Sequence, residues 1–329
     1  VIRNVDIGVQ CETTAEKEFY FQNTPEETNF DMICSASDEV VESKKTLLIK
    51  CTNIGIQCNI TMDHSSKQGT QPHSKIEYIR FKTSTCLSDK NQRPKISCVS
   101  WSTDDSFLAI DQSNNKVHFF TLTTPGNPMT LENPVDCTVS SWCFAIRTGS
   151  SEIFVFERNS LSFLFRLSNF SVVTAASPLS PLLACISKCT ISIKSSKNGP
   201  FKCLKFRSKD GIPFSLGYPR YGCVLTSGKF VVSDFENEFV YFFDENAVLF
   251  RKEFFCSPGS IVVDTDNAIY IADFFAHSVI VTNFEGSFRE MINLKPHVIH
   301  PRSISLSPDY KLAVAFENNV YLFQLKQRT

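Results

Sequence analysis

Cysteine and histidine side chains near the start of the chain are the first residues that could do chemistry, because both are zinc ligands. Cys51, Cys58, His64 and His73 stand in one stretch, with six, five and eight residues between them. Structural zinc sites use tighter pairs, with two to four residues between the cysteines. We therefore interpret these four as two strand cysteines and two loop histidines, and we expect no metal and no other cofactor.

Covalent catalysis needs a nucleophile paired with a base, and no spacing of Ser, Cys, His and acidic residues indicates such a pair. The net charge is −1, so no overall field attracts nucleic acid or a membrane surface. Nor does any segment approach the roughly 18 consecutive apolar residues of a membrane span. We expect neither a membrane partner nor a small-molecule substrate.

The cysteine count indicates the compartment. The 13 cysteines are an odd number, and many lie in apolar segments, where a free thiol behaves as a small hydrophobic group. Unpaired cysteines of this kind are typical of a reducing compartment. Two glycosylation triplets begin at Asn59 and Asn169, but such triplets also arise by chance, and no signal-peptide pattern accompanies them. We expect a cytoplasmic protein.

The elements that must position any functional residue come from a repeat. Each unit opens with a proline, continues through an apolar strand, a polar turn and further apolar strands, and begins again about forty residues later. The openings are Pro94, Pro134, Pro219, Pro258 and Pro301, with an irregular one near Asn169. A strand-rich period of this length predicts a β-propeller with one four-stranded blade per repeat. The 30 phenylalanines favour the same all-β fold.

The last unit holds three strands and stops, which would leave an open sheet edge. Directly before the first repeat, Lys75–Thr83 has strand character and no partner of its own. We predict that it supplies the missing outer strand and closes a ring of six blades over 75–329. Residues 1–74 are interpreted as a β-rich N-terminal extension or part of a β-sandwich, without an assigned motif.

Two units carry a family resemblance. The segment IYIADFFAHSVIVTNFEGSF contains an Ala272-Asp273 step, His277 in a short polar loop, and a later Glu285-Gly286 turn. Ser233-Asp234 takes the same place one unit earlier. These units resemble NHL repeats. The loop arginine of that family is replaced by Ser278 and Phe239.

A WD-repeat propeller is the rival interpretation, because VSWSTDDSFLAI would suit it, but no Trp-Asp pair ends any blade. Propellers related to the NHL family also include metal-dependent lyases and lactonases, which ring the central tunnel with His, Asp or Asn. The predicted inner strands contain no histidine, and their two carboxylates, Asp136 and Asp264, are placed at strand ends. We therefore expect no enzyme.

The expected binding surface, called the loop face below, consists of two sets of loops on one side of the ring. The first leads into the inner strands (88–95, 125–134, 168–170, 207–220, 255–258 and 294–302) and carries eight basic and three acidic residues. The second joins second to third strands (111–116, 148–152, 187–189, 234–238, 273–278 and 317–319) and carries two basic and seven acidic residues. The charges cancel, which favours a protein ligand over RNA.

The candidate contact residues are basic or aromatic, because such side chains form hot spots for proteins and stack on bases. They are Arg93, Lys95, Lys209, Arg220, Tyr221, Phe235, Phe274, Phe275, His277 and Arg302. We expect a platform that binds a protein partner, and single-stranded RNA is the alternative. The resemblance implies a ubiquitin ligase of the TRIM-NHL type, or a repressor of messenger RNA. Any ligase activity would lie outside this chain, which has no RING or B-box series.

Overall fold

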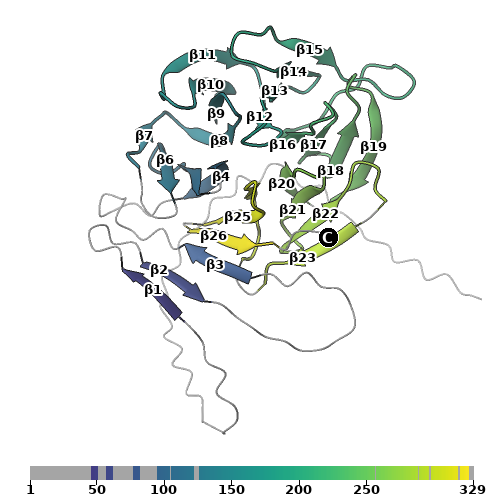
Figure 1. Ribbon diagram of the computed structural model, residues 1–329. Coiled ribbons are helices and arrows are strands. Elements are labelled where there is room, and N and C mark those ends of the chain that lie inside the picture. Colours follow the sequence, from purple (N-terminus) through teal and green to yellow (C-terminus); the bar gives the residue numbers. More distant parts are fainter. Residues whose placement is uncertain are drawn as a thin grey trace, which may run out of the picture. The chain divides into compact units, whose positions relative to one another are not determined.

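The protein is described by a computed structural model, whose strands form a ring (Figure 1). The structure describes residues 46–50, 57–61, 77–81 and 95–325, without 104, 122–125, 256, 288, 296–297 and 318; the three N-terminal segments are described as backbone alone. Within these residues the regular elements are all strands, and no helix occurs. The predicted all-β class is confirmed.

The first three blades follow one another along the chain. Blade 1 comprises β4 (Ile96–Thr103), β5 (Ser106–Asp111), β6 (Lys116–Thr121) and β7 (Met129–Thr130). Blade 2 comprises β8 (Pro134–Val139), β9 (Cys143–Thr148), β10 (Glu152–Glu157) and β11 (Phe163–Ser168). Blade 3, the irregular unit, comprises β12 (Val172–Ala175), β13 (Leu183–Ile186), β14 (Thr190–Lys194) and β15 (Lys202–Lys205).

The other three blades include the two best repeats. Blade 4 comprises β16 (Pro219–Val224), β17 (Phe230–Asp234), β18 (Phe239–Phe243) and β19 (Leu249–Phe254). Blade 5 comprises β20 (Pro258–Val263), β21 (Ile269–Asp273), β22 (Ser278–Thr282) and β23 (Arg289–Asn293). Blade 6 takes β24 (Ser303–Leu306), β25 (Lys311–Phe316) and β26 (Asn319–Gln324) from the end of the chain.

The fourth strand of blade 6 comes from the N-terminal side of the chain. β3 (Glu77–Phe81) pairs antiparallel with β26, so that Ile79 stands opposite Leu322. The inner strands contact one another in sequence around the ring, and β24 contacts β4. The predicted closure by residues 75–83 is therefore confirmed, and six four-stranded blades form a closed propeller.

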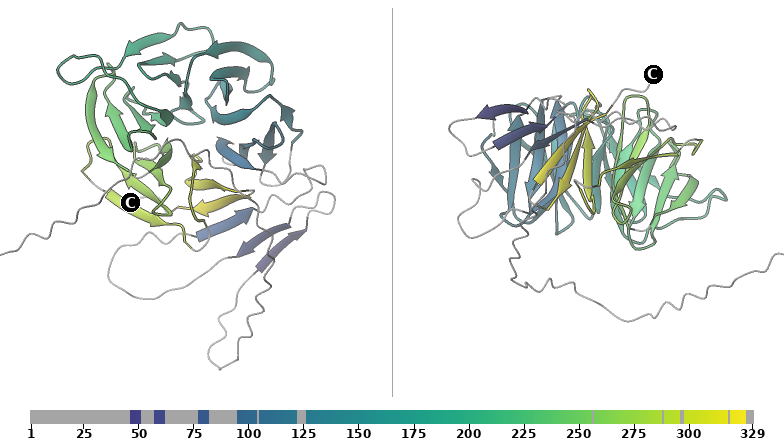
Figure 2. Two further views of the ribbon diagram at one scale, coloured as in Figure 1. Left: turned by 180° about the vertical axis from the view of Figure 1, so that it is seen from behind. Right: turned by 90° about the horizontal axis from the view of Figure 1, so that it is seen from below.

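Blade 6 continues outward beyond its fourth strand. β2 (Gln57–Thr61) pairs with β3, and β1 (Thr46–Lys50) pairs with β2, which extends this sheet to six strands. Figure 2 shows the two extra strands beside β3. The division of the chain at residue 74 stays a prediction.

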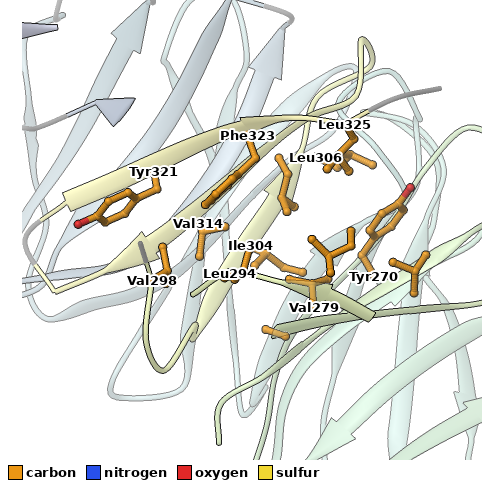
Figure 3. Packing of buried hydrophobic residues seen from close by; sticks show 14 of the residues in the cluster. Tyr270, Val279, Leu294, Val298, Ile304, Leu306, Val314, Tyr321, Phe323 and Leu325 are labelled. Carbon is orange, nitrogen blue, oxygen red and sulfur yellow. The ribbon is translucent and has the colours of Figure 1, made fainter. Parts of the chain in front are cut away.

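Apolar side chains fill each junction between neighbouring blades. Figure 3 shows the cluster where Tyr270 and Val279 of blade 5 meet Ile304 and Val314 of blade 6. The junction of blades 3 and 4 is aromatic, and the Phe206 and Phe243 rings stack there with centroids 4.7 Å apart. Since a strand alternates its side chains between the two faces of the sheet, each blade contributes to two such junctions. Close packing on both sides makes the ring a firm support for its loops.

Candidate binding face

The loop face is organised around an aspartate that ends the second strand of a blade. In blade 4 this is Asp234, which is fully buried. Its carboxylate accepts hydrogen bonds from the backbone N–H groups of Gly217 (2.6 Å) and Tyr218 (2.8 Å), and from the Asn237 side chain (2.8 Å). The loop before β16 and the loop after β17 are thereby tied together, because one carboxylate serves donors from both.

The same tie fixes two aromatic side chains. The Phe235 N–H donates to the Tyr218 carbonyl oxygen over 3.0 Å, which adds a direct bond between the two loops. Gly217 lies so close to the second loop that a Cβ there would stand 2.7 Å from the Asn237 amide nitrogen. Tyr218 and Phe235 nevertheless keep 53% and 41% of their surface exposed. Blade 4 thus presents two exposed rings on a hydrogen-bonded support.

Blade 1 repeats the arrangement with Asp111. Its carboxylate accepts the Lys95 N–H (3.1 Å) and the Asn114 N–H (3.3 Å), and the His118 Nε2 lies 3.9 Å away. Burial alone would raise the pKa of Asp111, but the hydrogen bonds from His118, Asn114 and Lys95 together lower it. In blade 5 the equivalent Asp273 accepts the Ala276 N–H over 3.0 Å.

These contacts correct the charge count of the loop face. Asp111 and Asp234 were counted among seven acids on the surface, yet their side chains are buried and bonded to backbone donors. Asp234 of the Ser-Asp step therefore holds a turn instead of facing a ligand, whereas Asp273 of the Ala-Asp step is half-buried and accepts one turn N–H. In the loop after β17, the exposed acids are Glu236 and Glu238.

Arg220 lies beside the Phe235 ring, at the start of β16. Its guanidinium carbon stands 5.1 Å from the centre of Phe235 and 5.8 Å from that of Tyr221, within cation–π range. Tyr221 faces the centre of the ring of blades, and burial raises the pKa of its hydroxyl group. The structure therefore brings three predicted site residues together, and the arginine helps to hold an exposed phenylalanine in place.

A second aromatic cluster lies where the blade 5 loop meets the start of blade 6. Phe274 stacks on His300 with ring centres 4.4 Å apart, and the Arg302 guanidinium stands 5.1 Å from the Phe274 ring. Phe275 packs edge-on against Phe274 and remains 56% exposed. The His277 Nδ1 accepts the backbone N–H of His300 over 3.0 Å. Phe274, Phe275, His277 and Arg302, all predicted site residues, belong to this one cluster.

The surroundings of His277 lower the pKa of its ring. Desolvation lowers the pKa of His277, and the nearby positive charge of Lys295 and the His300 ring lower it further, against the opposing effect of Asp273. A neutral imidazole leaves Nδ1 free to accept the backbone N–H. The hydrogen bond from the His300 N–H to the His277 Nδ1 requires a neutral His277 ring, and the lowered pKa favours that neutral form.

The remaining predicted site residues lie apart from these two clusters or outside the description. Lys95 is exposed on blade 1 and contributes its backbone N–H to Asp111. Lys209 lies against the outermost strand of blade 4, with its ammonium nitrogen 5.7 Å from the Phe250 ring. Arg93 falls outside the described residues.

A small cavity lies on the axis of the propeller. It has a volume of about 60 Å³, and residues from all six inner strands line it, including Cys98, Asp136, Tyr221 and Ser260. Its size suits a few water molecules. The hydroxyl, thiol and carboxyl groups around it would bind water in such a space.

Asp136 is the acidic residue of this cavity. It lies inside β8, where the sequence had placed it at a strand end, and its carboxylate accepts the Cys98 thiol over 3.2 Å. The Arg147 Nε is 4.0 Å away. Burial raises the pKa of Asp136, and the charge of Arg147 offsets this only in part. Asp264 follows β20 directly and accepts the Ala268 N–H and the Tyr270 hydroxyl, so it holds a turn.

Among the described residues, no group of three or more His, Cys, Asp and Glu side chains could hold a metal ion. Of the four N-terminal residues weighed as zinc ligands, only Cys58 falls in this part of the chain, as backbone of β2. The others lie outside it, so the expected absence of a metal stays a prediction. No described helix is long and apolar enough to cross a membrane.

Many solved structures are similar to this chain in fold. A streptogramin B lyase structure superimposes with a TM-score of 0.52 at 11% identity, over 77% of this chain and 98% of the other. The WD40 propeller domain of Doa1 gives 0.52 at 13% identity, over 73% and 95%. A Bacteroides thetaiotaomicron protein of unknown function gives 0.56 at 13% identity, over 72% and 71%.

This chain is a six-bladed β-propeller. The identities are too low to carry more than the fold, since one propeller fold hosts many functions. No family model matches the chain, and no curated protein matches it either. The NHL resemblance is thus not confirmed.

The sequence pattern did not single out one repeat position of the loop face, the residue directly before the opening proline. Ser257 and His300 each stand directly before a strand-opening proline, and both have a positive φ, 64° and 55°. His300 covers Phe274, whereas Ser257 lies beside the hollow next to Phe235. Aligning the units on their prolines would have revealed the pair.

Proposed function

We propose that this propeller is a non-catalytic platform that binds a protein partner through the loop face of blades 4 and 5. The observation that carries the proposal is a set of exposed rings on fixed loops. Phe235 and Phe275 are 41% and 56% exposed, and each is held by ring or cation contacts to its neighbours. Large exposed aromatic side chains with few accessible rotamers are typical hot spots of protein interfaces.

Charge supports a protein ligand over RNA at blade 4. A polyanion gains affinity from Lys and Arg that neutralise phosphates. Phe235 and Tyr218 instead border the two carboxylates of Glu236 and Glu238, and among the described lining residues Lys188 is the one cation. Single-stranded RNA remains the second candidate, because Arg220 and Arg302 each accompany an aromatic ring on which a base could stack.

We also propose which kind of protein this propeller serves and where in the cell it acts. The aspartates of the Ser-Asp step in blade 4 and of the Ala-Asp step in blade 5 accept turn N–H groups, which agrees with an NHL-like repeat. On that basis we propose partner recognition for a ubiquitin ligase or a post-transcriptional regulator of the TRIM-NHL type. The seven cysteines from Cys98 to Cys223 are free, five of them buried, which supports a cytoplasmic location.

Site-specific photo-crosslinking tests this function. A benzoylphenylalanine at Phe275 would sample the loop face, and one at Phe163 on β11 would sample the outer edge of blade 2. The two phenylalanines are equally exposed, at 56% each, so Phe163 is a matched control. In an extract of cells that express the protein, we expect a discrete protein adduct from position 275 alone. A nuclease-sensitive adduct at 275 would replace the proposal with RNA binding, and equal labelling from both positions would refute it.

A further inference from the structure

A hollow of about 600 Å³ lies on the loop face beside the two exposed rings of blade 4. Its lining consists of Lys188, Tyr218, Phe235, Glu236, Glu238 and Ser257. We call it the blade 4 groove. The volume falls within the range of sites that accept a small ligand or a few side chains.

The groove is built before any ligand arrives. Asp234 and the Phe235–Tyr218 backbone bond fix its aromatic walls relative to each other. Arg220 lies 5.1 Å from the centre of the Phe235 ring and is not among the lining residues, so it supports that wall. Fixed walls lower the entropy that binding would otherwise cost.

Comparison with the next blade shows why the groove is open. Phe235 and Phe274 occupy equivalent positions, each directly after the aspartate that ends a second strand. Phe274 is covered by the stacked ring of His300, the residue before Pro301. The residue before Pro258 is Ser257, which lines the groove. A serine in place of the histidine leaves the equivalent phenylalanine uncovered.

The charges of the lining select the ligand. Among the described lining residues, two glutamates outnumber one lysine, an excess of acidic side chains that opposes a phosphodiester chain and favours a cation. Aromatic walls favour an aromatic or large apolar side chain. From this combination, and building on the proposed function, we infer that the blade 4 groove binds a peptide segment of the partner in which an aromatic residue is followed by a lysine or arginine.

Short peptides test the inference by NMR. The probes are the blocked tetrapeptides Gly-Trp-Arg-Gly and Gly-Trp-Glu-Gly, titrated into the ¹⁵N-labelled full chain to about 5 mM, since single-anchor peptides bind weakly. We expect the Trp-Arg peptide to shift the amide signals of Gly217 and Asn237 and to bind at least fivefold more tightly than the Trp-Glu peptide. Equal binding of the two peptides, or no shift at these amides, would overturn the inference.

Two variants sharpen the test. Ser257→His copies the neighbouring blade at a position where both residues have a positive φ, so it should close the groove without removing a wall. We expect it to abolish the shifts, whereas Glu236→Lys should remove the preference for arginine over glutamate. Peptide shifts that persist in Ser257→His, or a uridine oligonucleotide that moves the same amides, would contradict the assignment.

The inference and the proposed function can fail separately. If a partner cross-linked at position 275 binds Ser257→His as tightly as the wild type, the platform function stands and the groove assignment falls. If the tetrapeptide binds the groove but position 275 labels no protein, the groove assignment stands and the proposed function falls.

Discussion

Some buried aspartates stabilise this propeller and another destabilises it, depending on the hydrogen-bond donors around each carboxylate. Asp111 and Asp234 are buried with several hydrogen-bond donors each. Asp136 is buried with the Cys98 thiol and the Cys137 backbone as donors and with an arginine at 4.0 Å. A buried charge without enough donors costs free energy, whereas one with several donors stabilises the fold.

Asp234→Ala should loosen the loop face. The change removes the carboxylate that accepts the backbone N–H groups of Gly217 and Tyr218, so both N–H groups lose this hydrogen bond. We expect the free energy of unfolding to fall by about 2 kcal/mol or more, because several hydrogen bonds to one charged group are lost. Urea titration measures this, and hydrogen exchange should show faster exchange at Tyr218 and Phe235. Unchanged exchange there would contradict the role assigned to Asp234.

Asp136→Asn should stabilise the protein at neutral pH. The pKa of Asp136 is raised in the fold above its usual value of 3.8, so below pH 3.8 both states hold the proton and no penalty exists. As the pH rises from 3.8 through the raised value, the unfolded state releases its proton first, and stability falls. Asparagine removes this loss, by roughly 1 kcal/mol at pH 7. Melting temperatures at pH 7 and pH 3.5 should show a gain at the former only.

Asp111→Asn should behave in the opposite way. The pKa of Asp111 is lowered in the fold, so its carboxylate adds stability above pH 3.8 that is lost as the pH falls through the lowered value. We expect a loss of about 1 kcal/mol at pH 7. Urea titrations at pH 7 and pH 3 measure it, and the difference from wild type should shrink at the lower pH. A stabilised variant at pH 7 would contradict this assignment.

The blades could be predicted from the sequence because each strand has a local residue pattern that indicates it. Proline-led openings, alternating apolar residues and the missing strand of the last unit predicted six blades and the closure by β3. The binding face followed only in part. Whether an aspartate faces solvent or a backbone N–H depends on the path of two loops, so Asp111 and Asp234 were miscounted as surface charges. The openness of the groove depends on which residue precedes a proline, as Ser257 and His300 show.

Ile79→Pro tests the closure of the ring. Ile79 stands opposite Leu322 of β26, and β3 also pairs with β2 at Arg80 and Phe81, so a proline at position 79 disrupts a strand inside the sheet. We expect a loss of about 3 kcal/mol or more in the free energy of unfolding. Leu48→Pro is the matched control, because β1 is the outermost strand and pairs on one side only. Equal stability of the two variants in urea would contradict closure by β3.

The molecule as a whole offers a ring with near-zero net charge and two neighbouring aromatic clusters on one face. Non-specific RNA affinity rises with the number of phosphates neutralised and falls steeply with salt. We expect uridine-rich and random RNA to bind no more tightly than micromolar at 50 mM salt. Fluorescence anisotropy at 50 and 200 mM salt measures this. Submicromolar, steeply salt-dependent binding that is lost in Arg220→Ala plus Arg302→Ala would favour RNA as the ligand.

The central claim is that the loop face of blades 4 and 5 binds a protein. Calorimetric titration with the purified partner protein, once cross-linking has identified it, tests this claim most directly. The titration compares the wild type, the double variant Phe235→Ala plus Phe275→Ala, and the equally exposed control Phe163→Ala. Because loss of a hot-spot side chain costs about 2 kcal/mol, we expect the double variant to bind at least tenfold more weakly and the control to match the wild type. Wild-type affinity in the double variant would contradict the account.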